Sequence, residues 1–122
     1  MTISNYGELE ILDHLTGRLA WTAPTAVYVK LHLADPTDTG TISPAVNTTR
    51  VVATWGVAAA GSITTNATIT WNNVSTTETY SHWSLWDNLT VGNCLWTGAL
   101  ATPISVTAGD TFEITSLTLT LE

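Results

Sequence analysis

Residues 80–100 read Tyr-Ser-His-Trp-Ser-Leu-Trp-Asp-Asn-Leu-Thr-Val-Gly-Asn-Cys-Leu-Trp-Thr-Gly-Ala-Leu. Two apolar segments of strand length, 80–86 and 94–100, flank a short polar connection that contains glycine. Such a connection between two such segments is typical of a β-hairpin. We therefore predict that this hairpin is the centre of a β-rich domain.

The spacing of two tryptophans inside the hairpin adds a prediction about packing. Trp83 and Trp86 differ by three positions, so a regular strand turns their side chains to opposite faces of the sheet. We expect one of them to lie in the core and the other to lie beneath a neighbouring element or subunit.

Other strands are predicted at 26–33, 49–55, 62–71 and 111–121. Residues 103–106 are predicted to be a short, separate edge segment, because proline has no N–H to donate to a ladder. Within 26–33, Val27, Val29, Leu31 and Leu33 share one face, and Tyr28, Lys30 and His32 share the other. Within 62–71, one face carries Ile63, Thr65, Ala67, Ile69 and Trp71. In the last strand the parity changes between Ile114 and Leu117, which predicts a bulge near 115–116 that lets Phe112, Ile114, Leu117, Leu119 and Leu121 all face one core.

One helix is predicted at the start of the chain, over about residues 4–15. Ser4 or Asn5 can cap its N-terminus, and Gly17 suits a left-handed C-cap. Apolar residues at helical spacing form a single stripe: Tyr6, Leu9, Leu12 and Leu15. A helix this short needs packing against something to persist.

Together these elements predict a mainly all-β fold, a single β-sandwich of about seven antiparallel strands with one short N-terminal α-helix. The whole chain, 1–122, is predicted to be one domain, with the helix at about 4–15 and the sandwich at about 19–122. Residues 35–46, which contain two prolines and a glycine, are predicted to form a long loop that is either a mobile tip or part of a contact.

Composition limits the classes of partner. Charged residues make up 11% of the chain, against about 25% in average proteins, and the net charge is −7. With Arg18, Lys30 and Arg50 as the only basic residues, a nucleic-acid or anionic-membrane surface is not expected. Threonine occurs 25 times and supplies polar surface without charge. The single cysteine, Cys94, cannot form an internal disulfide and is expected to be a buried small apolar residue.

No residue pattern predicts a reaction. His14, His32 and His82 have no compact metal-motif spacing, and no Gly-X-Ser-X-Gly segment is present. His82 and Asp87 can meet across the hairpin turn, and Asp35 and Asp38 can bind a cation, although structural histidines and a solvated loop are the favoured interpretations. We therefore predict no catalytic, cofactor-binding or metal-binding residue.

Six tryptophans in 122 residues leave two further interpretations open. Exposed tryptophans on a β-sandwich can stack on sugar rings, whereas buried ones are core or interface anchors. The core or interface interpretation is favoured.

The ordered motifs of the chain resemble a family of small phage virion proteins, the phage tail fibre or tail proteins of the Gp80-like group. The resemblance runs through 4–6 and 12–15, 28–40, 62–71, His-Trp-Ser-Leu-Trp-Asp at 82–87, 92–93, Trp-Thr-Gly-Ala-Leu at 96–100, Pro103, 108–111 and 117–122. The segment Thr49-Arg50-Val51 departs from the family's Gly-Tyr-Ala-Arg pattern, which leaves the strand register there open. The resemblance implies a virion structural protein with no enzymatic activity. We expect no cofactor, and because residues 1–8 lack the basic start and apolar run of a signal peptide, we expect a protein of the virion that is assembled in the cytoplasm of the bacterial host.

The chain has no heptads or shaft repeats, which favours a compact domain present in many copies. The first hypothesis is a capsid decoration (cement) protein that binds the major capsid protein. The alternatives are a tail-associated structural protein, as a component of the tail fibre or tail tip, and a carbohydrate-binding receptor module. The expected partners are major capsid or tail proteins and copies of itself, with a trimer as one possible homo-oligomer, and neither nucleic acid nor membrane. The 35–46 loop and the N-terminal helix are the candidate contact segments.

Overall fold

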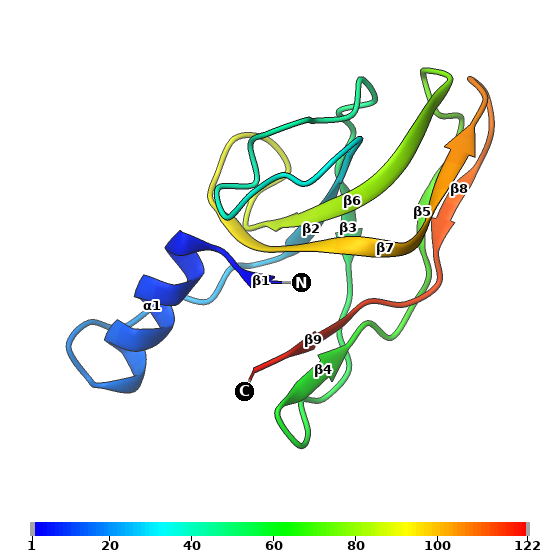
Figure 1. Ribbon diagram of the computed structural model, residues 1–122. Coiled ribbons are helices and arrows are strands. Elements are labelled where there is room, and N and C mark those ends of the chain that lie inside the picture. Colours follow the sequence, from blue (N-terminus) through cyan, green and yellow to red (C-terminus); the bar gives the residue numbers. More distant parts are fainter. Residues whose placement is uncertain (1, 122) are drawn as a thin grey trace.

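The computed structural model describes residues 2–121 and shows a mainly antiparallel β domain with one short helix. Figure 1 shows the helix standing beside one end of the sheets. The elements are β1 (Thr2–Ile3), α1 (Asn5–Leu15), β2 (Val27–His32), β3 (Val51–Ala53), β4 (Ser62–Thr64), β5 (Ile69–Trp71), β6 (Glu78–Trp86), β7 (Cys94–Val106), β8 (Phe112–Ile114) and β9 (Thr118–Thr120). The predicted all-β class with a short N-terminal helix is confirmed.

The main sheet has the strand order β1-β7-β6-β2-β3, and the predicted hairpin, β6 and β7, lies at its centre. All of its pairings are antiparallel. The hairpin is longer than predicted, because β7 continues through Pro103 to Val106 instead of stopping before a separate edge segment. An irregularity in register makes this possible: Tyr80 pairs with Ile104 and His82 with Ala99, so Pro103 is not required to donate to the ladder.

A second layer is formed by two short ladders, β5 with β8 and β4 with β9. The predicted single strand over 62–71 is therefore divided in two. The division lies at Thr65 and Asn66, where the chain also bonds to residues outside the ladder: Asn66 N donates to the Thr54 carbonyl at 3.0 Å. Thr65 Oγ1 accepts from Leu117 N at 3.0 Å, and this hydrogen bond joins the segment between β4 and β5 to the segment between β8 and β9.

The predicted change of parity in the last strand is present as the interruption between β8 and β9. It turns Phe112, Ile114 and Leu117 all into the core and leaves Leu119 half-buried. The prediction is wrong for Leu121, which is 54% exposed because it follows the end of β9.

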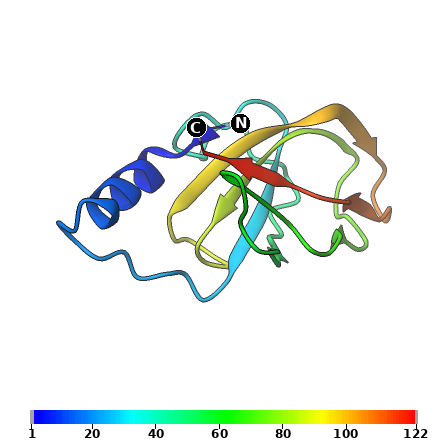
Figure 2. The same cartoon turned by 90° about the horizontal axis from the view of Figure 1, so that it is seen from below.

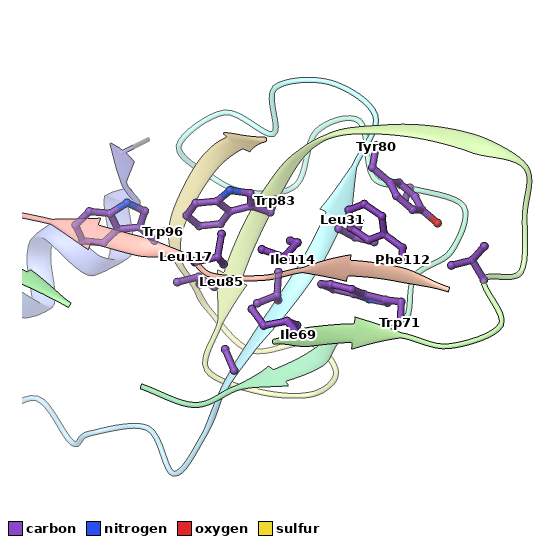
Figure 3. Close-up of a cluster of buried hydrophobic side chains, with 14 of the residues drawn as sticks. Leu31, Ile69, Trp71, Tyr80, Trp83, Leu85, Trp96, Phe112, Ile114 and Leu117 are labelled. Carbon is purple, nitrogen blue, oxygen red and sulfur yellow. The ribbon is translucent and has the colours of Figure 1, made fainter. Parts of the chain in front are cut away.

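The core lies between the two layers (Figure 3). Leu31, Tyr80, Trp83 and Leu85 come from the main sheet, and Ile69, Trp71, Phe112 and Ile114 from the second layer. The rings of Tyr80 and Phe112 meet edge to face with centroids 5.0 Å apart, a favoured aromatic geometry.

Hydroxyl side chains pair in several places on the surface of the domain. On the outside of the β4–β9 ladder, Thr64 and Thr118 lie 2.8 Å apart and Ser62 and Thr120 lie 2.9 Å apart, measured between their hydroxyl oxygens. The threonine-rich composition therefore supplies cross-strand hydrogen bonds as well as polar surface.

Candidate functional site

Helix α1 is held to the main sheet by its first turn. Ser4 caps the helix, since its Oγ accepts from Gly7 N at 3.0 Å and donates to the Cys94 carbonyl. Gly7 lies so close to β7 that a Cβ there would fall 2.8 Å from the Leu95 carbonyl oxygen. The helix therefore contacts the sheet through its backbone at Gly7, with Ile11 beside an apolar groove one turn later. Gly17, with φ of +75°, follows the helix as the predicted left-handed residue.

The leucines of the predicted apolar stripe face away from the domain. Leu9 is 65% exposed, Leu12 57% and Leu15 78%, and Leu19, just beyond the helix, is 57% exposed. We call these four residues the leucine stripe. Figure 2 shows α1 projecting from the sheets. The sequence predicts that the stripe exists, but it does not predict that the stripe faces away from the sheets. The face of the helix that packs on the sheet is built from Gly7 and Ile11, which form no strong apolar pattern.

The 35–46 loop, the second candidate contact segment, is packed against the main sheet and joined to β2 by backbone hydrogen bonds. Pro36, Gly40 and Ala45 are buried, and Pro44 forms a bridge with His32. Gly40 has φ of +69°, and its Cα faces Cys94 and Trp86 so closely that no side chain fits there. The loop is therefore a packed cover and not a free tip.

The loop and the helix meet. Asn5 N donates to the Asp38 carbonyl at 3.3 Å, and Thr2 Oγ1 donates to Asp38 Oδ1 at 3.3 Å. The outer side of the loop exposes two apolar side chains, Ile42 at 50% and Val46 at 64%. The two segments expected to make contacts are thus parts of one side of the molecule, joined at Asp38.

Beneath the loop, a buried polar network joins the loop to the sheet. His32 Nδ1 lies 2.9 Å from the Ile42 carbonyl, so that nitrogen carries the proton. His32 Nε2 then accepts from Ser84 Oγ at 2.7 Å, and Ser84 Oγ accepts from the Trp86 indole N–H at 2.7 Å. Burial lowers the pKa of His32 to about 4, which keeps it neutral.

The Ser84–His32 pair has the elements of a nucleophile and base, but both side chains are 0% exposed and a backbone carbonyl takes the place of a carboxylate. His32 therefore has the structural role that was expected for the histidines. Sequence reasoning could not find the pair, since its members lie 52 residues apart with no motif around either.

The other histidines also have local partners. His14 Nδ1 accepts from Trp21 N at 3.1 Å, and His82 Nδ1 lies 2.8 Å from Ser81 Oγ. The alternative in which His82 meets Asp87 gains no support, because Asp87 follows the end of β6 and both of its carboxylate oxygens accept from Asn93.

Asp35, Asp38 and His82 line one polar cavity of about 340 Å³. Asp35 Oδ1 accepts from Thr37 N at 2.9 Å, and Asp38 accepts from Thr2. Within residues 2–121, however, no three His, Cys, Asp or Glu side chains are arranged to hold a metal ion. The cation interpretation of these two aspartates gains no support.

The tryptophans are core and packing residues. Trp83 is 3% exposed on the core face and Trp86 is 7% exposed on the outer face, as the three-residue spacing predicts. Trp71 and Trp96 are also buried, and Trp21 and Trp55 are half-buried. Trp21, Trp55 and Trp96 line an apolar groove of about 280 Å³ beneath α1. This groove has an almost entirely apolar lining, which is unsuited to the hydroxyl groups of a sugar.

Helix α1 is too short to cross a bilayer, and it is the only helix in the described part of the chain, so no membrane span is found there. Cys94 is a buried free cysteine, and burial raises the pKa of its thiol to about 11.

Comparison with known proteins identifies the family. No curated protein matches the chain. The sequence matches the family model described as podophage GP4 fiber I protein gp80 over residues 2–122, which agrees with the resemblance seen in its motifs. The chain therefore belongs to this Gp80 family of podophage fibre proteins.

Proposed function

We propose that the protein is a structural component of the phage particle that attaches to the tail as part of a fibre assembly. The description of its family, which names a podophage fibre protein, supports the tail-associated role. The observation that supports attachment to another protein is the exposure of the leucine stripe. Four exposed leucines on and just after one helix form an apolar surface of the kind that marks protein contacts.

The way the helix is mounted supports this role. Ser4 and Gly7 fix its first turn to β7, while the stripe points outward. An isolated helix of 11 residues is marginal in water. Packing of the stripe against a second protein stabilises the helix further. We propose that the partners are other tail proteins and copies of this chain, with a trimer as one arrangement.

The compact shape argues for a docking domain and not for a fibre shaft. The described residues form two layers of strands around one core, without the repeated elements of a shaft. Capsid decoration, the first hypothesis from the sequence, rests on this compactness and on the neutral surface. The family description favours the tail-associated alternative, so we propose the latter. A sugar-binding module is less well supported, since four tryptophans are buried and the other two line an apolar groove.

Location on the particle tests the proposal. We expect quantitative mass spectrometry of purified virions to find only a handful of copies for each particle, and gold-labelled antibodies to mark the tail in electron micrographs. Hundreds of copies, with label over the head, would overturn the proposal in favour of decoration. A second arm uses tailless heads purified from the same lysate, which should lack the protein.

A further inference from the structure

Two of the three basic residues of this acidic chain lie side by side. The pairing of Val29 with Val51 in the antiparallel β2–β3 ladder puts Arg50, which directly precedes β3, across from Lys30. Like charges directly opposite each other destabilise a sheet. Arg50 also contributes to lowering the pKa of Lys30, second to burial. The arrangement therefore has an energetic cost that some other interaction must offset.

Both cations lie against the ring of Trp86. The guanidinium carbon of Arg50 is 4.2 Å from the ring centroid, and Lys30 Nζ is 5.6 Å from it. Arg50 Nη1 also donates to the carbonyls of Asn88 and Val91, at 2.8 and 2.7 Å, in the turn between β6 and β7. The guanidinium is thus held in one orientation before any ligand arrives.

Neither cation has an acidic partner in the part of the chain that the structure describes. Among residues 2–121, the one ion pair within 4 Å joins Arg18 to Asp13. Asp87 is near enough to affect the pKa of Arg50, but its two oxygens accept from Asn93 at 2.7 and 2.9 Å. Packing on Trp86 and hydrogen bonding to the turn account for the position of the Arg50 side chain. They leave Lys30 without a hydrogen-bond partner within the described part of the chain.

We propose that Lys30 and Arg50 form a binding site for an oxyanion, a carboxylate or phosphate group, beside the Trp86 ring. Both side chains are half-exposed, so a ligand can reach them. Arg50 keeps Nε and Nη2 available for two oxygens, and Lys30 offers a compact ammonium to the same group. A bound anion would also remove the repulsion between the two cations.

The test follows the Trp86 indole N–H and the Arg50 side-chain N–H by NMR while sodium phosphate, and separately sodium acetate, replaces sodium chloride at constant ionic strength. We expect saturable shifts confined to these groups and to Lys30. Saturation by phosphate alone assigns phosphate groups, and saturation by acetate alone assigns carboxylates. Shifts that do not saturate with either anion would overturn the proposal.

Two variants make the test specific. Lys30→Gln removes a cation that makes no hydrogen bond within the described part of the chain. The affinity of this variant for the anion should be about fivefold or more below that of the wild type. Arg18→Gln removes a cation on the far side of α1 and should bind the anion as the wild type does. Equal affinities in all three proteins would contradict the assignment, and the amide spectrum of each variant reports whether it is folded.

Discussion

Gly98 lies directly against the indole ring of Trp83 across the central hairpin. The two residues are cross-strand partners, and a Cβ at Gly98 would lie 2.7 Å from Cε2 of Trp83. The absence of a side chain at Gly98 is thus what leaves room for the Trp83 ring in the core.

Gly98→Ala should lower the free energy of unfolding by about 1–3 kcal/mol, because the added methyl group overlaps the buried Trp83 ring. Urea denaturation followed by circular dichroism measures the change. In a Trp83→Phe background, where the ring is smaller, the same substitution should cost less, so the double-mutant cycle gives a coupling energy. Strict additivity of the two substitutions would show that the contact does not limit packing.

Ser4→Ala should lower the free energy of unfolding by about 1–2 kcal/mol. It removes the N-cap of α1 and leaves the buried carbonyl of Cys94 without its donor. The matched control is Thr16→Ala at the exposed other end of the helix, where Oγ1 donates to the Leu12 carbonyl. Its effect should stay within about 0.5 kcal/mol. Similar losses in the two variants would show that Ser4 is no more than a surface cap.

His32 should make the protein less stable in acid. Its pKa is about 4 in the folded state, below its ordinary value of 6.5, so the unfolded chain binds a proton that the folded chain does not. Above pH 6.5 the low pKa of His32 costs no stability, because the histidine is neutral in both states. As the pH drops from 6.5 towards 4, the free energy of unfolding should fall by on the order of 3 kcal/mol. Denaturation midpoints across this range measure the slope.

The control for this pH dependence is the same series with His32→Gln and with His14→Gln. The first variant should lose most of the slope between pH 6.5 and 4, whatever its stability at neutral pH. The second keeps His32 and should keep the slope. An unchanged slope in His32→Gln would assign the acid sensitivity to other groups.

Replacing Leu9, Leu12 and Leu15 with glutamine should leave the isolated domain folded and nearly as stable, because the three side chains are exposed and glutamine is a good helix former. Incorporation into particles should fall by about tenfold or more if the leucine stripe is the attachment surface. Mass spectrometry of virions that carry the variant gene measures this loss.

The control for the stripe is Val57→Gln with Val91→Gln, at two side chains that are 93% and 83% exposed on other parts of the molecule. This variant should be incorporated like the wild type. Equal incorporation of the stripe variant and its control would remove the stripe from the attachment surface.

The sequence was sufficient for features that depend on neighbouring residues. Alternation and turn residues predicted the hairpin, and the spacing of Trp83 and Trp86 predicted their opposite faces. Ser4 and Gly17 predicted the ends of the helix. These features follow from local geometry, which repeats with a known period.

Features that depend on contacts between distant residues could not be predicted. The join between His32 and Ser84 spans 52 residues, and the direction of the leucine stripe depends on how closely Gly7 approaches Leu95. The division of the 62–71 strand has a similar cause, since Thr65 and Asn66 bond to residues on separate segments. No pattern within either segment specifies these partners.

The hydroxyl pairs between β4 and β9 have a consequence for the conditions that the domain tolerates. Neutral pairs such as Thr64 with Thr118 are not weakened by dissolved ions, whereas exposed ion pairs are. Only Arg18 and Asp13 form an ion pair within residues 2–121. The side-chain contacts that join β4 to β9 should therefore keep their strength as the salt concentration changes.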